Sequence, residues 1–396
     1  MVPGRGAPVR DAVVVLDDGR IAYAGPAADA PRTSGEATRV ATVLPGLWDC
    51  HTHLFGCRAL DLTQLPMEPV AIRAARCTHD LRAALDAGVT SVREVGGLGV
   101  YLARVVAEVA GPTVYAAGAM LATTGGHADL HSLPLPWVVD YAARGGELRV
   151  CDGVDDCMRA TREMLRRDAK LVKVCATGGA LSEVDDPRHQ QFALAELRAI
   201  VEVAALADRV VAAHCHGRAG IMVALEAGVR TIEHGTYLDD EACAAMLDAG
   251  AVLVSTRLVI EDVLSASAAP PYAVEKLEAM SDTHAKALLL AHEHGVPIAL
   301  GTDIAVTGDG LPASWGRHGR ELRHLVAAGL TPLQAIEAAT ANGPLTLGPQ
   351  APQSGQLTAG HDADVIAVDA DPLADIATLG DPAHVVGVWK HGRRVK

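Results

Sequence analysis

The chain has few aromatic residues and no long apolar stretch. Only 3% of its 396 residues are Phe, Trp or Tyr although 49% are hydrophobic, so a core must consist mainly of Ala, Val and Leu. No segment approaches the roughly 20 apolar residues that span a bilayer, and the N-terminus lacks a secretory signal pattern. We therefore expect a cytoplasmic protein with no membrane partner.

Paired cysteines, an excess of positive charge and several catalytic motifs are also missing. The eight cysteines form no CxxC pair, which favours reduced thiols that fill core space. The net charge of −14 disfavours a nucleic-acid partner and leaves small molecules as the expected partners. The chain contains no GxSxG, P-loop or GxGxxG, so neither a serine hydrolase nor a nucleotide site is supported.

The chain does have histidines at the ends of apolar segments. The first segment, LPGLWDCHTHL at residues 44–54, runs out into His51 and His53. Because side chains alternate along a strand, these two imidazoles project the same way and can share one cation. An isolated HxH is more often chance than a metal site, so its weight depends on ligands from other segments of the chain.

A lysine stands inside the apolar segment AKLVKVCATGG at residues 169–179. Lys173 would need a strong reason to be buried there. One interpretation is a side chain that snorkels to the rim of a barrel. The other is that desolvation keeps the amine neutral and nucleophilic, so that it captures carbon dioxide as an anionic carbamate that bridges two metals.

Three further segments end in histidine or aspartate. RVVAAHCHG supplies His214 and His216, RTIEHGT supplies His234, and VPIALGTD ends in Asp303. Each histidine alone could be a hydrogen-bonded core residue, but the whole set is hard to explain by chance. A carbamate, an aspartate and a hydroxide would bring three negative charges against four from two Zn²⁺, which leaves a small positive excess to polarise a carbonyl.

The order of segments predicts a (β/α)₈ TIM barrel. Strands are expected near residues 43–50, 89–95, 113–120, 170–176, 209–214, 230–234, 251–256 and 297–302. Helical patterns stand between them, among them 70–86, 155–168, 194–207 and 273–295. Alternation of this kind is typical of a parallel barrel, in which the strand ends meet at one rim.

Both ends of the chain lie outside this alternation. A barrel alone needs about 250 residues. Residues 12–25 are predicted to form two strands joined at an Asp-Gly turn, and residues 362–396 also contain short apolar segments typical of strands. We expect the two ends to pair into a small β-sandwich, with residues 1–44 and 346–396 in the sandwich and residues 45–345 in the barrel.

The ordered blocks PGLWDCHTHL, KVCATGG, AAHCHG, TIEHGT and GTD resemble the amidohydrolase superfamily over almost the whole chain. The residues within these motifs are similar to those of the imidazolonepropionase-like branch, which includes Xaa-Pro and Xaa-Arg dipeptidases, ochratoxinase and phenylurea hydrolase. The resemblance implies two divalent cations, with Zn²⁺ expected ahead of Mn²⁺ or Co²⁺, and a homo-oligomer. It assigns one metal to His51, His53 and Asp303, the other to His214 and His234, and the bridge to carbamylated Lys173.

The same resemblance implies the reaction. A metal-bridging hydroxide would attack an amide carbonyl, and Asp303 would act as general base and then as general acid toward the departing amine. The expected substrate is an N-acyl amino acid or a dipeptide, including an ochratoxin-like amide. Two alternatives stay open: an arylurea or carbamate hydrolase on the same site, and a mononuclear imidazolonepropionase-like cyclic amide hydrolase or deaminase, against which Lys173 argues.

Four side chains are candidates for substrate binding. His127, in the loop at residues 123–137, matches a position that the family uses near the substrate, although a loop histidine could also face solvent. His216 could bind substrate oxygen or support the ligands. Arg257 could present a guanidinium to a carboxylate or could be a salt-bridged structural residue, and Tyr237 could reach the pocket. We also expect Arg93 and Glu94 to form an ion pair at the rim.

Overall fold

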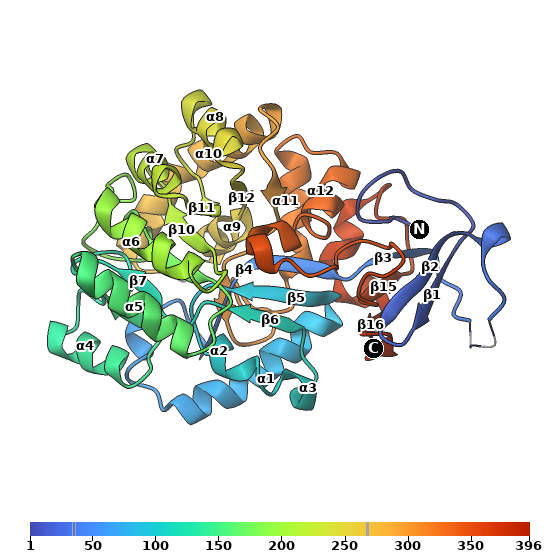
Figure 1. Cartoon of the computed structure of the whole chain (residues 1–396), viewed down its shortest axis with the longest axis horizontal. Coiled ribbons are helices and arrows are strands. Elements are labelled where there is room, and N and C mark those ends of the chain that lie inside the picture. Colours follow the sequence, from blue (N-terminus) through green and yellow to red (C-terminus); the bar gives the residue numbers. More distant parts are fainter. Residues whose placement is uncertain (34, 36, 267–268) are drawn as a thin grey trace.

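The computed structural model describes residues 1–33, 35, 37–266 and 269–396, and its centre is a closed barrel of parallel strands (Figure 1). The barrel strands follow in chain order: β4 (Leu47–Cys57), β5 (Val89–Glu94), β6 (Thr113–Ala116) with β7 (Met120–Ala122), β9 (Val172–Cys175), β10 (Val211–Cys215), β11 (Thr231–His234), β12 (Val252–Val254) and β13 (Ile298–Ala299). The predicted (β/α)₈ barrel is confirmed, and each strand lies within a few residues of its expected range.

Two features close the barrel. The third strand is interrupted, so that β6 pairs with β5 while β7 pairs with β9. Where the first and last barrel strands meet, the backbone N–H of Cys50 on β4 donates to the carbonyl of Leu300 at 2.8 Å. The backbone N–H of Asp303 likewise donates to the carbonyl of His51 at 2.8 Å. Asp303 is therefore held beside the first histidine of β4 by main-chain bonding.

Helices surround the barrel (Figure 1). The long ones are α1 (Val70–Asp86), α5 (Val154–Arg166), α6 (Leu194–Ala205), α7 (Arg218–Ala227), α8 (Asp240–Ala249), α9 (Arg257–Ala266) and α10 (Pro271–Glu293). Shorter ones are α2 (Gly99–Leu102), α3 (Val106–Val109), α4 (Leu135–Ala143), α11 (Glu321–Ala327) and α12 (Pro332–Ala338). Two short strands lie at edges: β8 (Leu148–Val150) beside β7, and β14 (Ile304–Val306) beside β4. In the described part of the chain, no helix is long and apolar enough to cross a membrane.

The two chain ends form the predicted β-sandwich, and both termini lie at this end of the molecule (Figure 1). One sheet is the hairpin of β1 (Ala12–Asp17) and β2 (Arg20–Pro26). The other has the order β17 (Arg393–Arg394), β16 (Val385–Lys390), β15 (Val365–Val368) and β3 (Thr42–Pro45). Ile21, Leu357 and Val365 are buried together between them. The domain boundaries at residues 44 and 346 stay a prediction.

The expected first strand at residues 43–50 divides at Gly46, which corrects the prediction of one continuous strand. β3 belongs to the sandwich and β4 to the barrel. A Cβ at Gly46 would lie 2.1 Å from the Thr90 hydroxyl oxygen, so only glycine lets the chain pass so close to β5. The Gly46 N–H donates to the carbonyl of Asp364 at 2.9 Å, which ties the junction to the sandwich.

The core matches the composition. Its largest cluster is built mostly of Ala, Val and Leu, with Phe192 as its one phenylalanine among the described residues. All eight cysteines are buried and unpaired, as expected for thiols that fill core space. Small aliphatic side chains suit a barrel interior because the strands approach one another closely there.

Candidate active site

Hydrogen bonds to two separate parts of the barrel hold the first two histidines in one tautomer. His51 and His53 lie on β4, which is buried along its whole length. His51 Nδ1 is 2.7 Å from Glu233 Oε2, and His53 Nδ1 is 2.7 Å from the carbonyl of Gly96. Because these oxygens act as acceptors, each Nδ1 carries the proton and each Nε2 keeps a free lone pair. Both free nitrogens therefore suit a metal ion.

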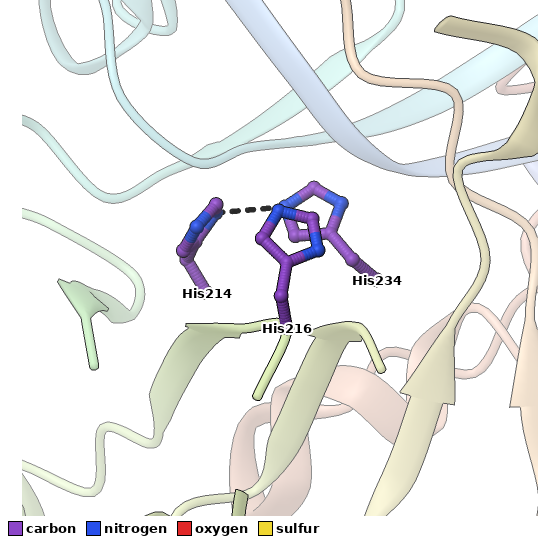
Figure 2. Close-up of side chains that lie close together, drawn as sticks. All are labelled: His214, His216 and His234. Carbon is purple, nitrogen blue, oxygen red and sulfur yellow. Dashed lines mark hydrogen bonds between the residues drawn. The ribbon is translucent and has the colours of Figure 1, made fainter. Parts of the chain in front are cut away.

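His214 and His234 turn toward each other from neighbouring strands, as the dashed line in Figure 2 shows. His214 Nε2 donates to the carbonyl of Gly178 at 3.1 Å, which leaves its Nδ1 without a proton. That Nδ1 lies 2.9 Å from His234 Nε2, while His234 Nδ1 lies 2.7 Å from the Thr256 hydroxyl. Two imidazole nitrogens that converge in this way are suited to hold one cation.

Lys173 is buried on β9 without an acidic partner in the described part of the chain. Its side chain is 1% exposed, and its Nζ lies 3.5 Å from His51 Nε2. Burial lowers the pKa of Lys173 below the usual range of a lysine. Burial thus shifts Lys173 toward its neutral form, although Glu233 and Asp303 oppose this shift. The snorkelling alternative would have placed the ammonium in solvent.

Asp303 completes the group just after β13. Its Oδ1 lies 3.2 Å from His53 Nε2 and 3.5 Å from His51 Nε2. Burial alone would raise its pKa, but His51, His53 and Lys173 lower the pKa of Asp303 to about 2. The carboxylate is therefore ionised at neutral pH.

The backbone is strained at two of these positions. His234 has φ 69° and Asp303 has φ 59°, in the left-handed region that non-glycine residues rarely adopt. Each such residue costs about 1–3 kcal/mol and persists where the surroundings hold it, often at functional sites.

Ligand atoms of His51, His234 and Asp303 lie within 4.8 Å of one another, as do those of His214, His216 and His234.

The six expected ligands surround one cavity of about 550 Å³ that opens to solvent: His51, His53, Lys173, His214, His234 and Asp303. The rest of its wall is mainly apolar, with Phe55, Leu60, Leu62, Met120 and Leu181. A second cavity of about 470 Å³ lies beside it and shares Leu60, Leu62, His127 and Leu181 with it. Neither cavity is lined by an arginine, and Lys173 is the one lysine among these lining residues.

The carboxylate that supports His51 was not among the residues expected from the sequence. Glu233 is fully buried on β11, and its Oε1 lies 2.5 Å from Arg93 Nη2. Burial opposes ionisation of Glu233, but the charge of Arg93 and the hydrogen bond from His51 lower the pKa of Glu233 below its usual range. An acidic residue inside the four-residue buried strand TIEH was the available signal.

The expected ion pair of Arg93 with Glu94 is wrong. Neighbouring residues on a strand point to opposite faces, so Arg93 enters the barrel and meets Glu233. Glu94 accepts from the backbone N–H of Leu54 at 3.3 Å, and burial raises the pKa of Glu94 to about 8.

One of the four candidates for substrate binding lines the cavities, and the other three do not. His127 lines both cavities, and its ring stacks on His214 with centroids 4.3 Å apart. His216 stacks on His234 at 4.8 Å, and its Nδ1 lies 2.7 Å from the Thr236 hydroxyl. His216, Tyr237 and Arg257 are not among the residues that line either cavity.

Arg257 has structural partners instead. Its Nη2 donates to Glu261 Oε1 at 2.5 Å and to the Ser281 hydroxyl at 2.8 Å. The Glu261 contact lies within α9 and the Ser281 contact joins α9 to α10, which agrees with the salt-bridged alternative for this residue. The ring of Tyr237 packs against the apolar cluster that contains Val259 and Leu277.

Comparison with known proteins identifies the class. The amidohydrolase family model matches residues 42–395. The ochratoxinase of Aspergillus niger is 41% identical over 416 residues, which cover 100% of this chain and 85% of that protein. The crystal structure of A. niger ochratoxinase has a TM-score of 0.95 at 41% identity, with 100% of this chain and 93% of that chain covered. The chain belongs to the amidohydrolase family.

A second solved structure shares the fold. A prolidase complexed with N-methylphosphonate-L-proline has a TM-score of 0.88 at 32% identity, and the match covers 97% of this chain and 94% of that chain. Together with the family membership, these relatives show that the protein is a hydrolase that acts on carbon–nitrogen bonds.

Proposed function

We propose that this protein is a binuclear metal-dependent amidohydrolase that cleaves the amide bond of an N-acyl amino acid or a dipeptide. The observation that carries the proposal is Lys173, a buried amine without an acidic partner among the described residues, 3.5 Å from the free Nε2 of His51. A neutral amine in this position is suited to form a carbamate, whose two oxygens would bridge two cations.

The residues present suit two divalent cations, with Zn²⁺ the first choice. His51, His53 and Asp303 would hold one, His214 and His234 the other, and carbamylated Lys173 would belong to both. Imidazole nitrogens with carboxylate oxygens are a donor set that zinc prefers, although Mn²⁺ and Co²⁺ accept the same donors. When bound, the two ions would supply a water that ionises near neutral pH and a Lewis acid for the carbonyl.

Asp303 is the proposed general base and acid. Its carboxylate is ionised and lies against both histidines of β4, so it can accept the proton of the attacking water. The same proton then passes to the departing amine, which is otherwise too basic to leave. Glu233 would hold His51 in its tautomer throughout, and it is not among the residues that line either cavity.

The cavity that the six proposed ligands surround has an apolar wall that suits an acyl or aromatic group. The names of the relatives point to amides of this kind. We therefore include an ochratoxin-like amide among the expected substrates. No arginine lines either cavity, so a substrate carboxylate would have no guanidinium there. This observation keeps an arylurea or carbamate as the second candidate. Lys173 argues against a mononuclear imidazolonepropionase-like reaction, which needs no bridging lysine.

The test is amine release from a matched panel by the zinc-loaded enzyme. Each N-acyl amino acid or dipeptide, with ochratoxin among them, is set beside its neutral carboxamide and beside an arylurea. Turnover of the free acids supports the lead proposal. Turnover restricted to neutral compounds replaces it with the urea or carbamate hydrolase. No turnover of any C–N substrate at full metal occupancy contradicts both.

Two further proposals concern the whole molecule. We propose a homo-oligomer, because three large apolar side chains each expose 55–58% of their surface: Met67 just before α1, Val70 at the start of α1, and Trp137 in α4. Light scattering on the purified protein would measure its mass.

We also propose a cytoplasmic location, because all eight thiols are unpaired; cell fractionation tests it.

A further inference from the structure

The loop after β9 is fastened to α10 by one lysine. Lys276 Nζ donates to the carbonyls of Asp185 at 2.5 Å, Ser182 at 2.6 Å and Gly179 at 3.2 Å. Three main-chain bonds from one ammonium hold residues 179–185 in a single arrangement. Leu181 of this segment lines both cavities, and Ser182 lines the second cavity.

Within the loop, Asp185 is surrounded by donors. Its Oδ2 accepts from the Gly179 N–H at 3.2 Å and from Gln191 Nε2 at 3.1 Å, and its Oδ1 lies 3.4 Å from Lys276 Nζ. Its Oδ1 also accepts the hydroxyl proton of Ser182. The side chain of Asp185 is 6% exposed, so this carboxylate is held by the protein rather than by solvent.

The direction of these bonds determines which nitrogen of His127 carries the proton. The Ser182 hydroxyl has one proton, and its contact with Asp185 is much shorter than the 3.4 Å to its other acceptor, the carbonyl of Gly179. Ser182 must then accept at its oxygen from His127 Nδ1, which lies 2.7 Å away. Neutral His127 therefore has its proton on Nδ1 and a free lone pair on Nε2.

We infer that Ser182 and Asp185 are positioning residues that hold His127 with a bare Nε2, so that this nitrogen accepts a hydrogen bond from the N–H of a secondary amide substrate. His127 lines both cavities and stacks on His214 at 4.3 Å, so it lies one side chain away from the proposed metals. Its ring bonds Ser182 through Nδ1, and its Nε2 makes no hydrogen bond within residues 1–33, 35, 37–266 and 269–396.

A bare Nε2 on His127 would affect substrate choice, an expectation that rests on the proposed function. A carbonyl or carboxylate oxygen has no proton to donate to a bare nitrogen, whereas the N–H of a secondary amide has one. A tertiary amide, such as a prolyl or N-methyl amide, lacks that proton. The enzyme should therefore prefer secondary amides over their N-methyl counterparts by about tenfold, the ratio expected for one hydrogen bond in a desolvated site.

The first experiment does not depend on turnover. Neutron diffraction from crystals of the zinc-loaded enzyme grown in D₂O locates the exchangeable protons directly. We expect deuterium on His127 Nδ1 and on the Ser182 hydroxyl, directed at Asp185, and none on His127 Nε2. Deuterium on Nε2 alone would overturn the inference, even if the protein proved to have another substrate.

The second experiment compares variants on one pair of substrates, an N-acyl amino acid and its N-methyl form. Ser182→Ala and Asp185→Asn should lower the secondary-to-N-methyl ratio of kcat/KM from about tenfold to near one. Ser182→Thr keeps the hydroxyl and should keep the ratio. Asp186→Asn is the matched control, because Asp186 lies on the same loop but its side chain bonds Arg188.

Equal losses on both substrates in Ser182→Ala would show a merely structural loop and would overturn the inference. A wild-type enzyme that turns over neither substrate would instead contradict the proposed function, while the neutron result still decides the state of His127.

Discussion

His51 Nδ1 lies 2.7 Å from Glu233 Oε2 in the interior of the barrel, and Arg93 binds the other oxygen of the same carboxylate at 2.5 Å. The bond fixes the tautomer of His51 and makes its Nε2 a stronger electron donor. All three side chains are at most 1% exposed. A support of this kind couples metal affinity to the stability of the barrel.

Glu233→Gln should therefore weaken metal binding by about 10- to 100-fold, because His51 loses its charged acceptor. It should also lower the free energy of unfolding by about 3–5 kcal/mol, because Arg93 is left as an unpaired buried charge. Competition with a chelator measures the first effect and denaturant unfolding the second. Glu226→Gln, on the surface of α7, should change neither; unchanged metal affinity in Glu233→Gln would exclude the supporting role.

Lys173→Ala should lose bound metal and activity together, because the carbamate can no longer form. Small carboxylates such as formate should restore part of both, since they can occupy the space of the carbamate. Metal analysis and amine release give the readout, and isotope-labelled bicarbonate should label the wild type only. The control is Lys170→Ala, whose exposed ammonium pairs with Asp168. Full activity in Lys173→Ala would end the two-metal proposal.

Asp303→Asn should lower kcat by about 10²- to 10⁴-fold, the range for loss of a general base or acid. The loss should be smaller on activated anilides, because their amine leaves without full protonation. Since Asp303 is also a proposed ligand, metal content is measured on the same samples. Asp309→Asn, at a solvent-facing carboxylate after β14, serves as the comparison. Equal losses on activated and ordinary amides would rule out the proton-transfer role.

Asp80 predicts a pH dependence of stability. Burial raises its pKa to about 7, although the Thr307 hydroxyl bond at 2.5 Å opposes the rise. An unfolded aspartate titrates near 3.9. The folded state thus keeps a proton that the unfolded state loses, so the stability contribution is full below about pH 4 and is lost as pH rises through about 7.

Asp80→Asn should remove this slope, which amounts to at most about 1.4 kcal/mol per pH unit. The variant should be more stable than the wild type at pH 8, and this advantage should disappear at pH 4 to 5. Thermal unfolding across this pH range provides the measurement, with Asp248→Asn on exposed α8 as control. Parallel pH profiles for wild type and Asp80→Asn would refute the raised pKa.

Arg257→Ala should lower stability by about 1–3 kcal/mol and leave KM unchanged for free acids. The guanidinium bonds Glu261 within α9 and Ser281 on α10, so its loss breaks these structural contacts and not a contact to substrate. Steady-state kinetics and denaturant unfolding separate the two effects. A selective rise in KM for carboxylates would restore the substrate-binding role expected from the sequence.

Local sequence patterns were sufficient for the order of the elements. The helix expected at residues 70–86 has the same bounds as α1, because its apolar spacing and the Pro69 before it are local signals. The histidines, Lys173 and Asp303 were recognisable because each ends or interrupts an apolar strand, and a parallel barrel brings such ends to one rim. Whether they bind two metals stays a prediction.

Only the tertiary structure decided which side chains meet across the barrel. Arg93 pairs with Glu233, 140 positions away, rather than with its neighbour Glu94. Gly46 divides a continuous apolar segment because Thr90 lies against it. The link from Asp185 through Ser182 to His127 joins two loops that are separate in the chain. Periodicity reports the face of a single segment, whereas these contacts depend on which segments are neighbours and on the rotamers that close packing allows.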